Sequence, residues 1–490
     1  MNFGLISKVL GVLLLIVGSG MAICAAFALV ASGWQTDGDE FYALGMGAGI
    51  TLAVAIVLVA IGLRSTNTIL RRDAAIAVGL GWILAAVFGG LPYLFSEPRL
   101  EWDEAFFEAM SGFTTTGSTV MQDIEAFPRA ILLWRSLTQW MGGIGIVVLF
   151  VAVLSFLGVG SRNLIMQESS LNIGDSVSAR IRDVAKTLCL VYVVLSIICF
   201  AGLLFLGMTP FNALCHTFTT LSTGGFSPHN ASLGHYDSLP IEAWIAGFML
   251  LGSVGFMLYV QAIIGRWSRI RSEEEARYYV VLLLLATLTV AFSLSNKAPD
   301  VTYIEGLRRA FFTIVSISTT TGFGTEDFDQ WPVSTIIILA ILMLIGGCAG
   351  STAGGLKMNR LIVGLKVFYQ QLVRSYRPSQ TFALKLNGKA PSSGFRFDTI
   401  FIFFAAGLTC GVSMLLIAEI EPQLSFQSVV GAVFGTLFNI GPGFDQLGPT
   451  NNFSELKPFT LVFLSFLMAI GRLEFYAILV LFVPSLWKRY

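Results

Sequence analysis

Charged side chains are scarce in this chain. Asp, Glu, Lys and Arg make up 12% of its 490 residues, about half the share found in soluble globular domains. Hydrophobic residues make up 55%, and the mean hydropathy is +0.76. Apolar stretches near 20 residues recur along the whole length, and such a length is typical of a membrane-spanning helix. The composition therefore excludes an ordinary water-soluble domain and indicates a polytopic membrane protein.

Patterns typical of disulfide, metal and catalytic sites are also missing. The six cysteines lie in or beside apolar segments without CxxC spacing, so we interpret them as small packing residues. The three histidines, His216, His229 and His235, show no ligand spacing. The sequence contains no recognisable nucleophile–base pair or nucleotide-binding fold. We therefore expect no enzymatic activity, no cofactor held by this chain and no nucleic acid among its partners.

In the first apolar segment, about residues 5–32, Lys8 precedes a long apolar run, as a basic residue does in a secretory signal. Its apolar part is too long for a signal peptide, and further spans follow. We therefore expect a first transmembrane helix within the lipid bilayer.

The placement of charge predicts the orientation in the membrane. With the N-terminus inside, most basic residues fall in inner loops, including a dense group between Lys357 and Arg396. Most acidic residues fall in outer loops, for example Glu326 and Asp327. We expect cytoplasmic termini and an acidic outer mouth, which would concentrate cations and repel anions. The net charge is zero and says nothing about partners.

Four segments share one order of residues: a stretch of short-helix length, then small or hydroxyl residues, then glycine. They are AFFEAMSGFTTTGS, FNALCHTFTTLSTGGFS, LRRAFFTIVSISTTTGFG and VVGAVFGTLFNIGPGF. Aligned on Gly117, Gly224, Gly322 and Gly441, they lie roughly 100–120 residues apart, which indicates an internal repeat. A longer apolar stretch precedes and follows each segment. The repeated unit is therefore an outer helix, a short descending helix, an extended turn and an inner helix.

The short helices predict the architecture. At about 1.5 Å per residue they cannot cross a bilayer, so they enter and return on the outer side. Non-helical backbone at that depth needs protein or water to satisfy its polar groups. Four like loops therefore predict a pseudo-fourfold axis, where rings of backbone carbonyls replace the hydration shell of a cation. The threonines could instead serve only as helix-end partners.

The predicted fold class is an all-α polytopic membrane protein with four potassium-channel-like repeats around one pore, preceded by two extra transmembrane helices. This arrangement amounts to ten spanning helices and four half-helices. Residues 1–70 hold the two extra helices. The pore repeats occupy residues 71–160, 161–270, 271–396 and 397–490.

The segment GGCAGSTAGGLK, from Gly346 to Lys357, interrupts the third inner helix. A phosphate-binding loop is one interpretation, but the segment lacks GK[ST] and follows a membrane span, not a strand. Its glycines break the helix where the pore should pass. We expect a flexible gating loop that obstructs the pore and moves to open it, the alternative being a passive packing kink. The candidate gate residues are Gly346, Gly347, Gly350, Ser351, Thr352, Gly354, Gly355 and Lys357.

Arg472 lies deep in the last apolar stretch, where a charge is costly and usually functional. Glu474 is close in sequence, but residues two apart on a helix point away from each other. We expect Arg472 to face the pore or the gating loop and to raise a barrier to cations. The alternative is a structural tie to carbonyls of the short helices.

These features together resemble the Trk/Ktr/HKT superfamily of potassium transporters, specifically the TrkH-type membrane subunit. The likeness covers nearly the whole chain and rests on the four loops, on IGGCAGSTAGGLK and on AIGRLEFYA in the last span. The two N-terminal helices favour the TrkH branch over the shorter Ktr branch. The resemblance implies potassium uptake across the bacterial cytoplasmic membrane through a gated pore. It also implies a homodimer, regulated by a cytosolic TrkA-type ring that binds ATP, ADP or NAD.

The resemblance also implies a selectivity filter. It places filter carbonyls at Thr115, Thr116, Gly117, Ser222, Thr223, Gly224, Thr320, Thr321, Gly322, Asn439, Ile440 and Gly441. Family members with serine at the first filter glycine tend to favour sodium. This chain has Gly117 there, so we expect it to favour potassium. The fourth loop lacks hydroxyl residues, so we expect a less strict filter.

Two other functions stay open at this point. A coupled secondary transporter would move potassium with protons or sodium, and such carriers usually show paired broken helices with binding groups at the midplane. A polytopic membrane enzyme would use the glycine-rich segment to hold phosphate. Flux measured with and without a proton gradient tests the first alternative, and nucleotide binding to the isolated chain tests the second.

Overall fold

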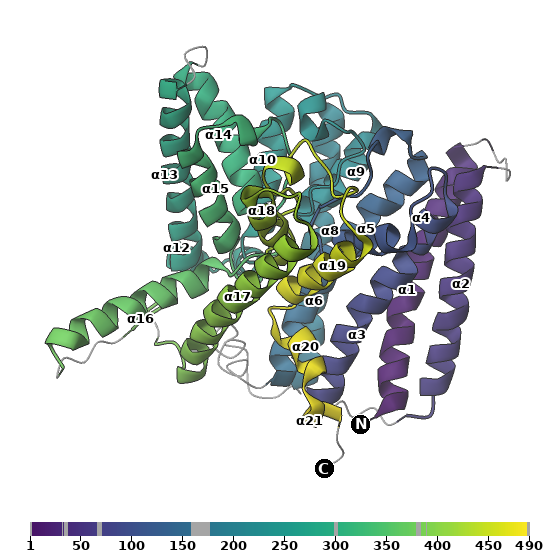
Figure 1. Ribbon diagram of the computed structural model, residues 1–490. Helices are drawn as coiled ribbons and strands as arrows, with labels where there is room; N and C mark the ends of the chain where they lie inside the picture. The colour runs from purple at the N-terminus through teal and green to yellow at the C-terminus, as the bar shows by residue number, and fades with distance from the viewer. Residues whose placement is uncertain are drawn as a thin grey trace.

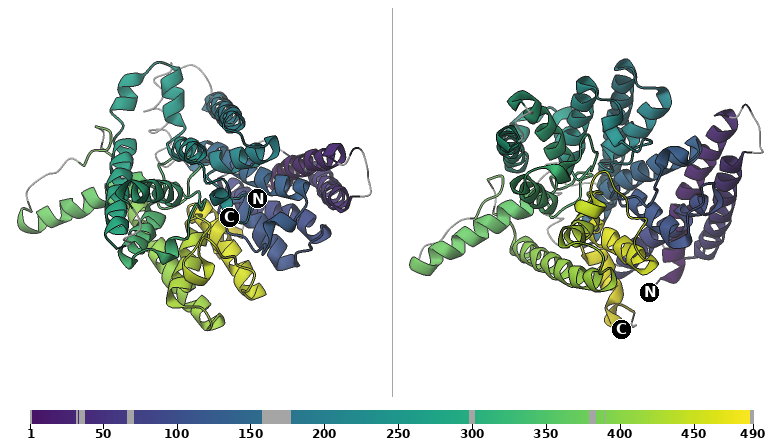
Figure 2. Two further views of the ribbon diagram at one scale, coloured as in Figure 1. Left: turned by 90° about the horizontal axis from the view of Figure 1, so that it is seen from above. Right: turned by 45° about the horizontal axis from the view of Figure 1, so that its top comes forward.

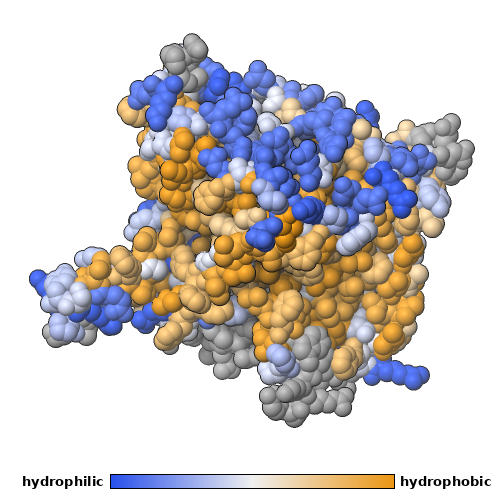
Figure 3. All heavy atoms as spheres, in the orientation of Figure 1, coloured by the Kyte–Doolittle hydropathy of each residue, from blue (hydrophilic) through white to orange (hydrophobic). Residues whose placement is uncertain are grey.

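The computed structural model describes residues 2–31, 33, 38–65, 71–157, 177–297, 302–378, 384–388 and 390–487. The regular elements in these ranges are all helices. Both ends of the chain lie at one face, and the short helices of the repeats lie toward the opposite face (Figure 1). A broad apolar band crosses the visible side, with hydrophilic residues above it (Figure 3). This is the surface expected of a chain that crosses a bilayer.

The two N-terminal helices are α1 (Phe3–Ala31) and α2 (Asp39–Gly62), and they pair along their length (Figure 1). Glycines make the close approach possible. A Cβ on Gly11 would lie 2.8 Å from the Val59 side chain, and one on Gly18 would lie 2.8 Å from Leu52. Small residues at such contacts allow apolar helices to pack tightly within a membrane, where the hydrophobic effect contributes little to helix association.

Four repeats follow, each with an outer helix, a short pore helix and an inner helix. Repeat 1 holds α3 (Arg71–Gly89), α4 (Leu91–Phe95), α5 (Trp102–Phe113) and α6 (Arg129–Leu157). Repeat 2 holds α8 (Val177–Phe205), α9 (Pro210–Leu221), α10 (Leu239–Ser253), α11 (Met257–Ile263) and α12 (Trp267–Arg271). Repeat 3 holds α13 (Glu274–Lys297), α14 (Tyr303–Ser318), α15 (Val333–Ile345) and α16 (Met358–Tyr376). Repeat 4 holds α17 (Ser393–Ile420), α18 (Phe426–Leu437), α19 (Pro458–Arg472), α20 (Tyr476–Leu479) and α21 (Pro484–Trp487).

The repeats surround a common centre when seen from above, with α1 and α2 at the periphery and α16 projecting outward (Figure 2). A 3₁₀ turn follows the pore loop in every repeat. These turns are η1 (Ile124–Ala126), η2 (Ser232–His235), η3 (Phe328–Gln330) and η4 (Asp445–Leu447); a further turn, η5 (Val480–Phe482), lies near the C-terminus.

The pore helices α5, α9, α14 and α18 all begin at a residue whose side chain caps the helix. Glu101 forms a capping box with Glu104, and Thr209, Thr302 and Ser425 each accept a hydrogen bond from a backbone amide in the first turn. Such caps satisfy amides that have no partner within the helix. Local sequence therefore sets where each chain segment turns inward.

Three of the four inner helices are broken; the break after α15 was predicted from the glycine-rich segment, whereas those after α10 and α19 were not. Helix α10 ends at Ser253 and α11 continues at 96° to it, α15 ends at the glycine-rich loop, and α19 ends at Arg472. Helix α6 runs unbroken to Leu157, its last described residue. In the described ranges, six helices are long and apolar enough to cross a membrane, or seven if α10 and α11 form one span.

Candidate functional site

Each pore helix ends in a Schellman motif whose left-handed residue is not glycine. Thr115, Thr223, Thr320 and Asn439 have φ angles of 53°, 52°, 56° and 56°. Each of these amides donates to the carbonyl three residues back, and the following amide donates to the carbonyl five residues back. Left-handed threonine is uncommon and strained, and such conformations cluster at functional sites. The same unusual helix end therefore occurs four times around the centre.

A glycine with positive φ follows two residues later in every loop, and these four glycines close a ring. A Cβ on Gly117 would lie 2.2 Å from the carbonyl oxygen of Gly224, and one on Gly225 would lie 1.8 Å from that of Thr321. A Cβ on Gly322 would lie 2.0 Å from the Ile440 carbonyl oxygen, and one on Gly441 would lie 2.8 Å from that of Thr116. Each loop thus abuts a carbonyl of the next, and the fourth returns to the first. No side chain fits at these positions without displacing backbone.

The register of repeat 2 differs by one residue from the alignment on Gly224. The left-handed residue is Thr223 and the ring glycine is Gly225, so the equivalent triplets are 115–117, 223–225, 320–322 and 439–441. Ser222 is the helix C-cap instead. The alignment on Gly224 was wrong because this loop has two adjacent glycines. Sequence alone does not tell which of them meets the neighbouring carbonyl.

A buried ion pair that the sequence analysis missed supports the first two loops. Arg135 Nε of α6 lies 2.6 Å from Glu108 Oε1 of α5, and the two side chains are 3% and 0% exposed. Arg135 also donates to the Ser227 carbonyl at 3.0 Å and lies over the Phe226 ring, 3.5 Å from its centroid. Glu108 accepts from the Val120 amide at 3.0 Å. The pair thereby fixes the chain that leaves both loops.

Gln139 of α6 holds the second loop from behind. Its Nε2 donates to the Gly224 carbonyl at 2.7 Å, and its Oε1 accepts from the Phe226 amide at 3.1 Å. The Gly441 carbonyl similarly accepts from Ser118 Oγ at 2.7 Å. A carbonyl oxygen has two lone pairs, so these two predicted filter oxygens can accept a second partner.

Two buried polar atoms at the inner end of the loops hydrogen-bond to no group in the described ranges. They are Thr115 Oγ1 and Asn439 Oδ1. Their counterpart Thr320 Oγ1 accepts from the Gly354 amide of the glycine-rich segment at 2.6 Å. Buried oxygens without a partner are rare and call for a ligand or a functional role.

The predicted gating loop, residues 346–357, lies against the inner ends of three of the four pore segments. Thr352 Oγ1 donates to the Leu221 carbonyl at 3.1 Å, and the Gly355 amide donates to the Phe438 carbonyl at 3.1 Å. Together with the Thr320–Gly354 contact, these bonds reach the inner ends of α9, α14 and α18. The structure thus brings the predicted gate residues into contact with Thr320 of the predicted filter and with Leu221 and Phe438, which directly precede two other predicted filter segments.

The predicted gating loop is a closed hairpin that is also hydrogen-bonded to a residue of another helix. Its neck pairs the Leu356 and Lys357 amides with the Leu344 and Ile345 carbonyls at 3.0 and 2.9 Å. The buried Lys357 ammonium donates to the Ala353 carbonyl within the loop. Sequence reasoning missed the anchor: Glu275 Oε1 of α13 accepts from the amides of Ala349 and Asn359, at 2.8 and 3.0 Å. One carboxylate therefore bonds both the loop and the start of α16.

Arg472 contacts the gating loop as expected. Its guanidinium NH1 donates to the Thr352 carbonyl at 2.6 Å, and the residue is 3% exposed. Its Nε and its second terminal nitrogen meet no hydrogen-bond partner in the described ranges. Glu474 pairs with Arg360 of α16 and not with Arg472, in agreement with the sequence argument. A buried, incompletely paired positive charge therefore lies at the level of the loop.

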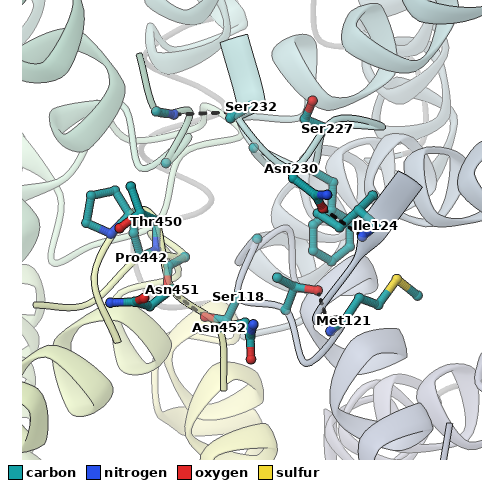
Figure 4. A pocket seen from close by; sticks show the side chains of 18 of the residues that line it. Ser118, Met121, Ile124, Ser227, Asn230, Ser232, Pro442, Thr450, Asn451 and Asn452 are labelled. Carbon is teal, nitrogen blue, oxygen red and sulfur yellow. Dashed lines mark hydrogen bonds between the residues drawn. The ribbon is translucent and has the colours of Figure 1, made fainter. Parts of the chain in front are cut away.

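A cavity opens above the ring of glycines toward the outer face (Figure 4). Its lining includes the neutral polar residues Ser118, Asn230, Ser232, Asn451 and Asn452, together with Arg135 and His229.

This lining corrects one expectation, because Glu326 and Asp327 border a different hollow. They lie there beside Lys297 and Arg309, and Glu326 Oε1 is 2.9 Å from Arg309 Nε. These two acidic residues therefore do not line the cavity, and the charge of Glu326 is paired with that of Arg309.

Comparisons with known proteins agree with this geometry. The TrkH family model, described as cation transport protein, matches residues 48–489. The Trk system potassium uptake protein TrkH of Salmonella typhimurium is 35% identical over the full length of both chains, and that of Escherichia coli K12 is 34% identical over the same coverage. The crystal structure of the potassium transporter TrkH from Vibrio parahaemolyticus has a TM-score of 0.89 at 32% identity and covers both chains completely.

These matches confirm the resemblance drawn from the four loops and the glycine-rich segment. They place the chain in a transport family and not among membrane enzymes. The chain belongs to the TrkH family of cation transport proteins.

Proposed function

We propose that this chain takes up potassium across the cytoplasmic membrane through a gated, channel-like pore. The observation that carries the proposal is the closed ring, in which the positive-φ glycine of each loop abuts a carbonyl of the next loop. The printed names of the full-length relatives, potassium uptake proteins of the Trk system, support the same activity.

The proposed filter consists of backbone carbonyls from the four loops in the register of the structure. These residues are Thr115, Thr116, Gly117, Thr223, Gly224, Gly225, Thr320, Thr321, Gly322, Asn439, Ile440 and Gly441. Carbonyl oxygens of this kind replace the hydration shell of a potassium ion. The pore helices end at the loops, so their partially negative C-terminal ends favour a cation at the centre.

The gating loop closes the proposed pore in this conformation. Hydrogen bonds from the loop to Leu221, Thr320 and Phe438 hold it against the inner ends of the pore helices. The Arg472 guanidinium adds a fixed positive charge at that level, which repels an entering cation. Opening requires the loop to exchange these bonds for others, and the glycines at its neck give the backbone the freedom to do so.

Regulation and assembly follow the expectation from the family resemblance. We infer that two copies associate and that a cytosolic TrkA-type subunit carrying ATP, ADP or NAD controls the gate from the side of both termini. Helix α16 supports this inference because it projects from the body and exposes Leu365, Phe368, Tyr369 and Leu372. Basic residues near this helix suit an inner membrane surface.

A proton- or sodium-coupled transporter is the second candidate. The breaks in α10, α15 and α19 favour it, because broken helices at the midplane are typical of such carriers. Potassium flux into liposomes with and without an imposed proton or sodium gradient distinguishes the two. Flux that follows the potassium gradient alone supports the pore.

The test of potassium uptake uses cells that lack their own uptake systems. Expression of the chain should restore growth at low potassium and rubidium uptake, and deletion within residues 346–355 should raise the rate of uptake. Failure of the wild-type chain to restore uptake, in membranes that contain it together with its regulatory subunit, contradicts the proposal.

A further inference from the structure

The outer loops of repeats 1 and 2 bring together three side chains with metal-ligand chemistry. They are Glu125 in η1, His229, and His235 at the end of η2, and one ligand atom from each lies within 4.8 Å of the others. The imidazole rings of His229 and His235 stack in parallel, with centroids 3.8 Å apart and planes at 3°. His229 Nδ1 lies 3.1 Å from Glu125 Oε1. Folding has created this group from residues that show no ligand spacing in sequence.

The backbone that presents the three side chains is held independently of them. The Ile124 amide donates to Asn230 Oδ1 at 2.7 Å, and Asn230 Nδ2 donates to Asp123 Oδ1 at 2.8 Å. These bonds join the two outer loops on either side of the cluster. The backbone beside Glu125 and His229 is therefore held in place before any ligand arrives, which lowers the cost of binding.

His229 also has an orienting partner of the kind found at metal sites. Its Nε2 lies 2.9 Å from the side-chain amide of Asn212. Turning that amide would present Oδ1 as an acceptor for an Nε2 proton, leaving Nδ1 free for a metal.

We propose that Glu125, His229 and His235 bind a divalent transition-metal ion of the Zn²⁺ type at the outer face. Two imidazoles and one carboxylate suit zinc, whereas Mg²⁺ and Ca²⁺ prefer oxygen ligands alone. Three protein ligands leave the fourth tetrahedral position to water. The Glu125 side chain is 50% exposed and His235 is exposed, so both can rotate to shorten the present spacing to bonding distance.

The site would act on the pore through charge and through the loops it joins. His229 lines the same cavity as Gly117, Gly322 and Gly441. Ile124 and Asn230, which neighbour Glu125 and His229 in sequence, also line it (Figure 4). A bound divalent ion would lower the local concentration of monovalent cations there. It would also tie the outer loops of repeats 1 and 2 together. This effect on transport rests on the proposed function, whereas metal binding does not.

Binding is tested on the purified full-length chain in detergent, by zinc titration calorimetry and by the visible absorption of Co²⁺. Wild type should bind one ion per chain. His235→Ala and Glu125→Gln should each weaken binding by about 10–100-fold or more, because even outer partners of metal ligands contribute that much. Glu455→Gln, which changes an exposed acid outside the cluster, is the matched control and should bind as wild type does. Absence of zinc binding to wild type, or equal affinity in all four proteins, overturns the site.

The effect on transport is tested separately in liposomes, as the ratio of rubidium uptake with and without external Zn²⁺ in each protein. Zinc should reduce this ratio in wild type and in Glu455→Gln, and His235→Ala should abolish the reduction. Zinc that binds without changing the ratio overturns the regulatory role. If no protein transports rubidium, the proposed function fails while the calorimetric result stands on its own.

Discussion

The pore loops of repeats 1 and 3 differ from those of repeats 2 and 4 in what holds them. In the first pair, a hydroxyl at the helix C-cap bonds a hydroxyl within the loop: Thr114 to Thr116, and Thr319 to Thr321, each at 2.7 Å. Each of these loops is therefore self-supporting at its middle position, although Thr116 and Thr320 also accept hydrogen bonds from Asn439 Nδ2 and from the Gly354 amide. Because the two repeats lie diagonally across the ring, the self-supporting loops alternate with the others.

In repeats 2 and 4 the middle position has no hydroxyl, and an inner helix supplies the support instead. Gln139 of α6 bonds the Gly224 carbonyl, and Asn439 Nδ2 bonds the Met468 carbonyl of α19 at 2.9 Å. The backbone has fourfold pseudo-symmetry, but the side chains that stabilise it have at most twofold symmetry. Helix α19 also carries Arg472 at its end, so the fourth loop and the gate share one support.

The largest expected effect comes from breaking the ring itself. Gly225→Ala places a Cβ 1.8 Å from the Thr321 carbonyl oxygen and also requires alanine at positive φ. We expect nearly complete loss of potassium uptake with the protein still present in the membrane. Gly224→Ala, whose Cβ would meet only the Gln139 side chain, is the matched control and should retain more activity. The opposite order would restore the sequence-based register.

The buried ion pair behind loops 1 and 2 should have the next largest effect. Glu108→Gln leaves the Arg135 guanidinium buried without its carboxylate, which costs about 3–5 kcal/mol in comparable buried pairs. Thermal unfolding in detergent should therefore begin at a lower temperature. Glu108→Leu combined with Arg135→Met should recover much of that loss, because no unpaired charge is left buried. If the single variant unfolds as wild type does, the pair has no such structural role.

Some of the features described above follow from local sequence patterns, and others do not. The four loops and the glycine-rich break are local patterns, and they predicted the pseudo-fourfold fold. The breaks after Ser253 and Arg472 were missed. Gly252 and Gly255 flank the first and Gly471 precedes the second, but single glycines are tolerated in apolar helices. The second break turns at Glu474 and Phe475, which carry no breaker signal. The Glu108–Arg135 pair and the Glu275 anchor join separate helices. Such contacts depend on tertiary packing and not on any local pattern.

Arg472→Ala should increase transport instead of reducing it. The substitution removes the buried charge at the gating loop and the hydrogen bond to Thr352. We expect potassium uptake to rise on the order of tenfold, equivalent to a barrier lowered by about 1.4 kcal/mol. Arg472→Lys keeps the charge and serves as the control. Unchanged uptake kinetics in Arg472→Ala would exclude the barrier role and favour a purely structural tie.

The smallest expected effect is on ion preference, and it tests the difference between the two kinds of loop. Gln139→Met removes the support of loop 2 and leaves the Phe226 amide buried without its acceptor, at a cost of about 1–3 kcal/mol. Thr321→Val removes only the hydroxyl pair of loop 3, which contributes about 1 kcal/mol. Gln139→Met should therefore lower the preference for potassium over sodium more than Thr321→Val does, as measured by rubidium uptake in competition with sodium. An equal change in both variants would mean that the helix-supported loops are no more dependent on outside support than the self-supported ones.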